Sequence, residues 1–193
     1  MNKFVENKDY FEYLQKRSML GVLYHNYFLY PRLSHVLHGK VLDFGCGIGE
    51  FLKFRSNTIG VDVNEFNIEH CKTLGLKAEL LDEAGGIPFE NNSFSGVVID
   101  NVIEHILARE IDQVIDEIIR VLIPNGTIVV GVPGIKGYYS DPDHKVFYTE
   151  DNLVALFDRH GWVARRSFRV PLSWHFLERY MNQYCVYVVF HAR

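Results

Sequence analysis

An acidic residue and three alternating glycines stand close together in the segment VLDFGCGIGEF, residues 41–51. The apolar run ends at Asp43, and Gly45, Gly47 and Gly49 follow it. Because glycine has no Cβ, it adopts positive φ angles and lets a bulky ligand lie against the backbone. Open parallel sheets bind their ligands beyond the carboxyl ends of the strands. The spacing therefore predicts a turn that leaves room for a nucleoside.

The glycine spacing also separates two kinds of nucleoside ligand. A dinucleotide fingerprint is G-x-G-x-x-G, and its last glycine brings a helix N-terminus to a pyrophosphate. This chain has G-x-G-x-G followed by Glu50, whose negative charge suits a pyrophosphate badly. No tyrosine is followed by a lysine four residues later, the pattern that a short-chain dehydrogenase needs. A nicotinamide-dependent oxidoreductase is therefore a minor alternative.

The elements that must position these residues are short apolar runs separated by segments of helical period. The runs are rich in β-branched or apolar residues, as buried parallel strands are. Four of the five carry an aspartate at or near the C-terminal end. The runs are residues 40–45, 57–62, 77–82, 95–100 and 126–133. Between them, Asn64 can cap a helix that stops at Gly75, and residues 108–122 predict another helix. This alternation predicts a doubly wound α/β sheet.

The last part of the chain predicts one more helix and two strands. Thr149 can cap an acidic first turn, and Gly161 can end that helix. Residues 162–170 and 183–190 then have the composition of strands.

Length and composition favour one globular domain, since the chain has 193 residues, of which 48% are hydrophobic and 23% charged. The net charge of −4 favours small or neutral substrates over nucleic acid or an anionic membrane. Three widely spaced cysteines predict neither a disulfide framework nor a zinc knuckle. No apolar run approaches the ~18 residues of a membrane span, and the polar start MNKFVENKDY lacks the apolar core of a signal peptide. We therefore expect a cytoplasmic protein without a membrane span.

The pattern Asp-x-Gly-x-Gly-x-Gly, from Asp43 to Gly49, resembles the first motif of class I S-adenosylmethionine-dependent methyltransferases. The segments IGVDVN, LLDEAGGIPFENNSF, FSGVVIDNVIEHI and EIIRVLIPNGTIVVGVP resemble the later motifs in order, so the similarity runs from about Lys40 to Trp162. The resemblance implies a Rossmann-like, doubly wound, seven-stranded sheet with an antiparallel last strand. It implies S-adenosylmethionine as cofactor and S-adenosylhomocysteine as product. We expect an N-terminal helical cover at residues 1–39 and a core at 40–193, in one domain overall.

The same resemblance implies a donor site. Asp62 stands 19 residues after Asp43, where the family has an acidic residue that accepts both ribose hydroxyls. A carboxylate suits this task because it only accepts hydrogen bonds and can receive two donors. Asp82 is similar to the residue that accepts the adenine amino group, although Glu83 follows it in place of the usual small apolar residue. The predicted donor-binding residues are Asp43, Gly45, Gly47, Gly49, Asp62, Val63, Asp82, Asp100, Asn101, Tyr13 and Arg17.

Four of these residues, which form two pairs, are predicted to bind the donor from their position in the sequence alone. Asp100 and Asn101 follow a strand at the ligand edge, where they can line the methionine end of the donor or form an ordinary turn. Tyr13 and Arg17 are four residues apart on one helix face and can meet the donor's carboxylate.

Two histidines are the predicted catalytic residues. Glu104 and His105 look like the Glu-His pair that is common in this family after the fourth strand, although His105 can instead fix a helix start. His144 lies in a segment similar to the D-P-x-H…F-Y/F-T segment of some methyltransferases linked to bacterial polysaccharide and lipopolysaccharide pathways. An alcohol acceptor must lose a proton, and histidine has the unperturbed pKa nearest the working pH. His144 is the predicted general base, with a structural role as the alternative.

The absence of certain motifs narrows the class of acceptor molecule. Residues 100–105 read DNVIEH, where enzymes that methylate the amino groups of nucleobases have Asn/Asp-Pro-Pro-aromatic, and no Pro-Cys nucleophile occurs. The segment GVPGIKG lacks the acidic residue and amide of the metal-dependent catechol type, so no metal is expected. The leading prediction is methyl transfer to a small-molecule acceptor, at an oxygen such as that of a sugar. The alternative is a catalytically inactive donor-binding module that acts as a sensor or partner subunit.

The stretch YLQKRSMLGVLYHNYFLYPRL has two interpretations. Its aromatic residues can form a cover over donor and acceptor. They can equally form a buried stripe, and we favour the buried stripe because apolar stripes on helices are usually core. The stripe at helical spacing is Leu20, Leu23, Tyr24, Tyr27 and Phe28.

Overall fold

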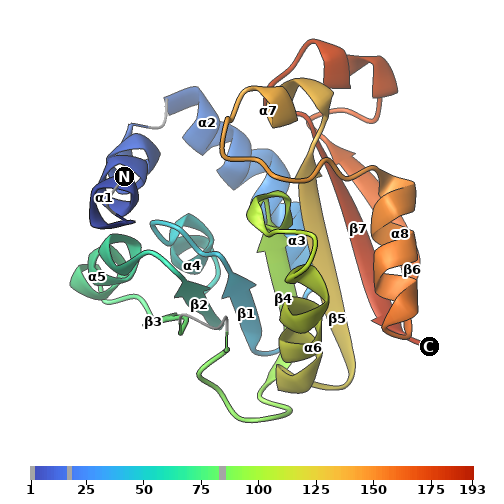
Figure 1. Ribbon diagram of the computed structural model, residues 1–193, viewed down its shortest axis with the longest axis horizontal. Coiled ribbons are helices and arrows are strands. Elements are labelled where there is room, and N and C mark those ends of the chain that lie inside the picture. The colour runs from blue at the N-terminus through green and yellow to red at the C-terminus, as the bar shows by residue number, and fades with distance from the viewer. Residues whose placement is uncertain (1–2, 17–18, 83–85) are drawn as a thin grey trace.

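The computed structural model describes residues 3–16, 19–82 and 86–193. Its centre is a seven-stranded sheet in the order β3-β2-β1-β4-β5-β7-β6 (Figure 1). The strands are β1 Val41–Phe44, β2 Thr58–Asp62, β3 Ala78–Leu80, β4 Phe94–Asp100, β5 Leu122–Pro133, β6 Trp162–Val170 and β7 Cys185–Ala192. Strands β1 to β5 are parallel, and β7 is inserted antiparallel between β5 and β6. The predicted Rossmann-like sheet with an antiparallel last strand is confirmed.

Helices alternate with the strands along the chain. The α-helices are α1 Lys3–Gln15, α2 Met19–Tyr24, α3 Tyr30–Val36, α4 Glu50–Phe54, α5 Glu65–Thr73, α6 Ile111–Val121, α7 Ile135–Tyr139 and α8 Glu150–Arg159. Shorter turns are the π-helix η1 His25–Leu29 and the 3-10 helices η2 Ile103–His105 and η3 His175–Arg179. Asn64 caps α5 by accepting the Phe66 N–H at 3.0 Å, and Thr149 forms a capping box with Asn152 at the start of α8. Both predicted caps are confirmed. No helix in the described part of the chain is long and apolar enough to cross a bilayer.

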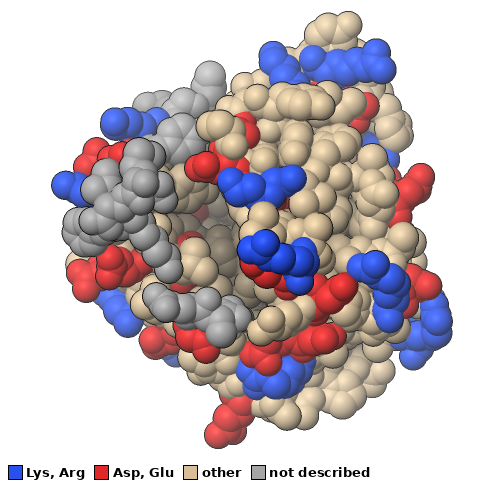
Figure 2. All heavy atoms as spheres, in the orientation of Figure 1, with Lys and Arg blue, Asp and Glu red and all other residues tan. Residues whose placement is uncertain are grey.

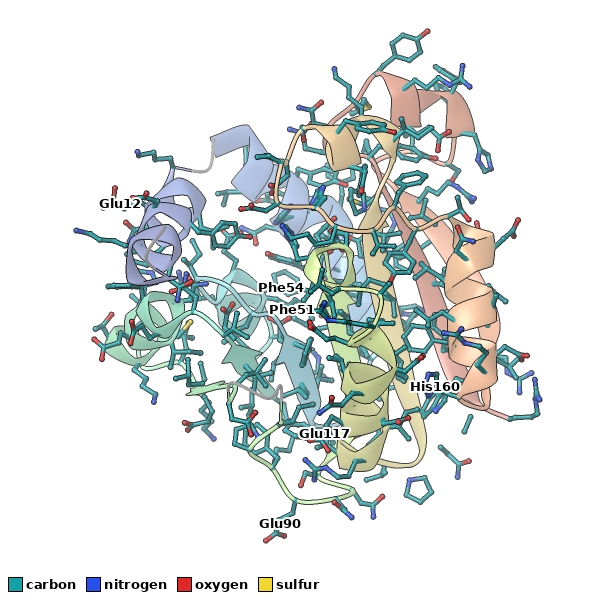
Figure 3. The ribbon with its side chains drawn as sticks, viewed as in Figure 1. Glu12, Phe51, Phe54, Glu90, Glu117 and His160 are labelled. Carbon is teal, nitrogen blue, oxygen red and sulfur yellow. The ribbon has the colours of Figure 1, made fainter. Side chains whose placement is uncertain are left out.

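Two apolar layers lie on the two faces of the sheet. Ile128 and Val130 of β5 pack with α6 and α8, whereas Val129 between them packs with α3 and Phe51 of α4. This division follows from the alternation of side chains along a strand. Phe51, which belongs to the second of these layers, is labelled in Figure 3.

The carboxyl ends of β1, β2 and β4 meet at one edge of the sheet. Phe44 of β1 is in register with Val61 of β2 and Ile99 of β4, so Asp62 and Asp100 stand one residue further along their strands. Figure 1 shows the turn η2 and the connection after α7 at the same edge. Helix α1 lies against α5, where the rings of Phe11 and Phe66 stack at 6.3 Å. The elements that carry the predicted site residues thus surround one edge.

The expected buried stripe of the N-terminal helices is wrong for three of its residues. Tyr27 is 73% exposed, and Phe28 and Leu23 are also exposed. The buried face is formed instead by Leu29, Tyr30, Leu33 and Leu37. Nearly every residue from 22 to 30 is apolar or aromatic, so the spacing fits several helix faces, and the π-helical turn η1 shifts the face again. Tyr24 is half-buried, and the Leu20 side chain lies outside the described part of the structure.

Candidate active site

The glycine turn after β1 gives its three glycines different environments. All three have positive φ angles, +80° at Gly45, +52° at Gly47 and +76° at Gly49. A Cβ at Gly45 would lie 2.4 Å from Val102, and one at Gly49 would lie 2.7 Å from Leu76. A Cβ at Gly47 would find its nearest neighbour only at 3.4 Å, in Leu14 of α1. Gly45 and Gly49 therefore allow close packing, whereas Gly47 is less crowded, since a Cβ there would only contact Leu14.

Asp62 is held beside this turn by backbone donors. One carboxyl oxygen accepts the Gly47 N–H at 2.8 Å, and the other accepts the Asn64 N–H at 2.8 Å. Burial raises the pKa of Asp62, and these bonds to the backbone of Asn64 and Gly47 oppose that rise. Each carboxylate oxygen can accept a second hydrogen bond. The side chain is thus fixed in place and still able to accept ligand hydroxyls.

Asp43, Asp62 and Asp100 place three carboxyl groups at the same edge. Burial raises the pKa of Asp43 well above its ordinary value, and the nearby carboxylates Asp100 and Asp62 raise it further. Carboxyl groups gathered beside this turn suit a ligand that carries hydroxyl donors and positive charge, because carboxyl oxygens accept hydrogen bonds. S-adenosylmethionine has both, in its sulfonium and ammonium groups and its ribose, so the residues present fit this cofactor.

Asp100 and Asn101 are tied to strand β7. The Tyr187 hydroxyl donates to Asp100 at 2.7 Å, and the Asn101 side-chain amide donates to the same oxygen at 2.8 Å. The Cys185 thiol contacts the Asn101 side-chain oxygen at 3.5 Å. Burial, and next the Asp100 charge, raise the pKa of Tyr187 well above its ordinary value. The sequence did not point to Tyr187 or Cys185, because the place of β7 beside β5 was not evident from it.

The other predicted donor residues have mixed surroundings. The Asp82 side chain is exposed and accepts the Gly86 N–H at 2.6 Å, closing its own loop. Val63 follows Asp62 and is also exposed. Tyr13 belongs to α1, but its side chain lies outside the described part of the structure, as does the whole of Arg17. Their predicted contact with the donor's carboxylate stays a prediction.

A second group of polar residues consists of Glu104, His105 and His144, here called the Glu104–His144 cluster. Glu104 lies in η2 and is 1% exposed, yet neither carboxyl oxygen has a hydrogen-bond partner in another described residue. Burial raises its pKa to about 8, and the charges of Asp100 and Asp141 contribute to the rise. The sequence placed Glu104 in a familiar pair but did not indicate that its carboxyl group is buried and unpaired.

His144 is oriented by its own loop. Its Nδ1 lies 2.7 Å from the carbonyl oxygen of Tyr138, so Nδ1 carries the proton and a neutral ring leaves Nε2 bare. Nε2 is 3.9 Å from Oε1 of Glu104. The loop is fixed on η2 because the N–H groups of Lys145 and Val146 donate to the Glu104 carbonyl at 2.7 and 3.1 Å.

The fold thereby brings the two predicted catalytic histidines together. Their ring centroids are 4.6 Å apart. Burial, and next the neighbouring His144, lower the pKa of His105. Figure 2 shows a hollow in the surface between α5 and the loop that follows α7. The arrangement can hold a cationic nucleoside at the strand ends and take up or release a proton at the histidines.

Comparison with known proteins shows what the central part of the chain is similar to. Residues 42–130 match a family model described as a methyltransferase domain. The human protein named "Probable tRNA methyltransferase 9B" is 27% identical over 161 residues, which are 79% of this chain and 32% of that protein. A sterol 24-C-methyltransferase of Schizosaccharomyces pombe is 30% identical over 118 residues, covering 55% of this chain and 31% of that protein. The chain thus spans about a third of the length of these curated relatives.

Solved structures share the fold. A SAM-dependent methyltransferase from Thermotoga maritima superimposes with a TM-score of 0.75 at 16% identity, covering 97% of this chain and 99% of that chain. At this level of identity the likeness concerns the fold.

Proposed function

We propose that the chain, whose residues 42–130 match a family model described as a methyltransferase domain, transfers a methyl group from S-adenosylmethionine to a small-molecule acceptor, at an oxygen such as that of a sugar. The observation that carries the proposal is the pairing of a fixed, buried Asp62 carboxylate with the cleared turn at Gly47. Such a site takes a ribose against the backbone and leaves a reactive group directed toward the hollow. The product is S-adenosylhomocysteine.

In this proposal the donor's ribose hydroxyls donate to Asp62, and the ribose lies against the backbone of Gly47. Asp43, at the end of β1, adds a third carboxyl group beside the turn, and its burial favours the neutral form. Leu14 of α1 lies over the turn at Gly47. The remaining donor-binding residues of the proposal are Gly45, Gly49, Val63, Asp82, Asp100, Asn101, Tyr13 and Arg17.

The sulfonium group supplies the chemical reactivity. The chain's task is to align the acceptor oxygen with the methyl group and to exclude water. An alcohol must also lose its proton, and in the metal-free protein the bare Nε2 of His144 is the group that receives it. His105, packed beside His144, supports this role.

The acceptor class is supported by charge and by missing motifs. A net charge of −4 disfavours nucleic acid as a partner, although one relative is named for tRNA and another for a sterol. The proposal therefore has a direct test, in which the full chain and labelled S-adenosylmethionine are offered free sugars, sugar nucleotides, sterols or tRNA. Formation of S-adenosylhomocysteine only with the sugars supports the proposal, and turnover only with tRNA or sterol contradicts it.

The second candidate is a donor-binding module without catalysis, which would act as a sensor or partner subunit. Such a module would have the same donor site. It would bind S-adenosylhomocysteine but would not transfer a methyl group to any acceptor. The expected cytoplasmic location stays a prediction.

A further inference from the structure

We propose that the Glu104–His144 cluster binds a divalent transition-metal ion of the zinc type. The proposal goes beyond methyl transfer, since binding of the ion needs neither donor nor acceptor. It also departs from the expectation of a metal-free site, which rested on the segment after β5 and not on these three residues. Within the described residues, this is the group of histidine, cysteine and acidic side chains whose ligand atoms converge.

The donor set decides the kind of ion. Glu104, His105 and His144 each offer one ligand atom, and these three atoms lie within 4.8 Å of one another. Two imidazole nitrogens and one carboxylate oxygen are a set that Zn²⁺ and Fe²⁺ use, whereas Mg²⁺ and Ca²⁺ prefer oxygen ligands alone. Two ligands of a tetrahedral zinc ion lie about 3.3 Å apart, given zinc–nitrogen bonds of about 2.0 Å. Nε2 of His144 and Oε1 of Glu104 are 3.9 Å apart, so small side-chain rotations would close the site.

The orientation of the two imidazoles is the second line of support. In metal sites, a ligating histidine usually donates its other N–H to a backbone carbonyl or carboxylate, which fixes the ring. His144 meets this condition through Nδ1 and the carbonyl of Tyr138 at 2.7 Å. The His105 ring packs against the His144 ring, with the two centroids 4.6 Å apart. The His144 ring is thus held by the chain on one side and has Nε2 for the ion.

The buried carboxyl group of Glu104 is the third line of support for the metal site. A buried carboxylate without partners is unfavourable, and a bound cation removes that cost. Glu104 is 1% exposed, and neither of its oxygens is hydrogen-bonded to another described residue. Asp141 lies at the rim with its carboxylate 4.0 Å from Nε2 of His144, where it adds negative charge. With the ion bound, Nε2 is a ligand, so the proton-accepting role of His144 belongs to the metal-free protein.

Zinc titration of the full chain tests the proposal. The chain is treated with a chelator, desalted and titrated with Zn²⁺ by calorimetry, and with Co²⁺ followed by visible absorption. We expect one ion per chain and a cobalt spectrum of low coordination number. Glu104→Gln, His105→Gln and His144→Gln should each weaken Zn²⁺ binding by at least about tenfold, since even loss of an outer partner has effects of that size.

The matched control is His160→Gln. His160 also sits between carboxylates, with its ring nitrogens 2.9 Å from Asp116 and 3.0 Å from Asp112, but at the far end of α8. This variant should bind Zn²⁺ like the parent chain. Absence of stoichiometric Zn²⁺ binding, or loss in His160→Gln with full binding in the cluster variants, would overturn the proposal.

Folding and donor binding are checked separately. Glu104→Gln keeps the shape of the side chain and removes only its charge, so circular dichroism should match the parent chain even if a histidine variant misfolds. Titration with S-adenosylhomocysteine reports the donor site independently. A chain that binds S-adenosylhomocysteine but no Zn²⁺ contradicts the metal site alone, whereas the reverse result contradicts the proposed methyl transfer.

Discussion

At the scale of single residues, the candidate site depends on how each side chain is held. Asp62 has both carboxyl oxygens engaged by backbone N–H groups, so it cannot rotate away from the turn. Gly47 owes its role to the lack of a Cβ on the side that faces Leu14. These two residues carry the donor proposal, and each can be tested alone.

Replacement of Asp62 by alanine should weaken donor binding. Hydrogen bonds to a charged group contribute about 1.5–3 kcal/mol each, so loss of the ribose contacts should lower affinity for S-adenosylhomocysteine by about tenfold to hundredfold or more. Titration calorimetry measures the change. Asp151→Ala, which removes an exposed carboxylate at the start of α8, is the control. Equal affinity of a folded Asp62→Ala chain would refute the ribose contact.

Gly47→Ala should reduce donor binding with only a modest loss of stability. The residue has φ +52°, so a Cβ adds backbone strain on the order of 1 kcal/mol and also enters the space kept for the ligand. Gly75→Ala is a matched control, because Gly75 has φ +71° and a Cβ there would have no neighbouring atom within 4 Å. Thermal unfolding with and without S-adenosylhomocysteine separates the two effects. The idea fails if ligand raises the melting temperature of both variants equally.

At the scale of elements, the ligand edge is held together by contacts between strands and turns that are distant in sequence. Strand β7 reaches β4 through Tyr187 and Asp100, which are 87 residues apart. The loop after α7 is fastened to η2 through the Glu104 carbonyl. Loss of either contact should loosen the edge without removing a predicted donor residue.

Tyr187→Phe should destabilise the fold. It removes a buried 2.7 Å hydrogen bond to Asp100, which should lower the free energy of unfolding by about 1–3 kcal/mol. Tyr184→Phe is the matched control, because the Tyr184 hydroxyl is buried and has no hydrogen-bond partner among the described residues. Its removal should be neutral or stabilising. Urea unfolding of both variants is the measurement, and equal loss in the two would show that packing and not the hydrogen bond is responsible.

At the scale of the whole molecule, methyl transfer requires the donor edge and the histidine cluster to face one space. The two residues that carry the donor proposal, Asp62 and Gly47, come from the end of β2 and the turn after β1, whereas the histidines come from η2 and the loop after α7. In the proposed function the first part binds the donor and the second accepts the proton of the acceptor. Variants of the donor edge should therefore change the affinity for S-adenosylhomocysteine, whereas variants of the histidines should change kcat.

His144→Ala should separate these two steps. In the metal-free chain with an alcohol acceptor, kcat should fall by about 10² to 10⁴, the usual contribution of a general base. Affinity for S-adenosylhomocysteine should stay within about a few-fold, because His144 lies outside the glycine turn and contacts Tyr138 and His105 instead. Single-turnover assays beside calorimetry are the test. Unchanged turnover would remove His144 from the mechanism, and lost donor affinity would place it in the donor site or the scaffold.

The sequence by itself determined the features that depend on local pattern. Alternating apolar runs and helical segments predict the sheet. Residues such as Asn64 and Thr149 predict where helices begin, because an N-cap side chain accepts a hydrogen bond from a backbone N–H only two or three residues further along the chain. The Asp43-to-Gly49 spacing predicts the ligand turn for the same reason. The buried face of the N-terminal helices was not predictable, because in a segment made almost wholly of apolar and aromatic residues the spacing fits several faces of the helix equally well.

Only the tertiary structure decided which distant residues meet. The insertion of β7 between β5 and β6 sets Tyr187 against Asp100, and the loop after α7 brings His144 to Glu104 and His105. It also decided that a Cβ would clash with neighbouring side chains at Gly45 and Gly49 but not at Gly47. Such contacts, and the burial that leaves Glu104 without a partner among the described residues, depend on packing between elements far apart in the chain. Local spacing carries no information about that packing.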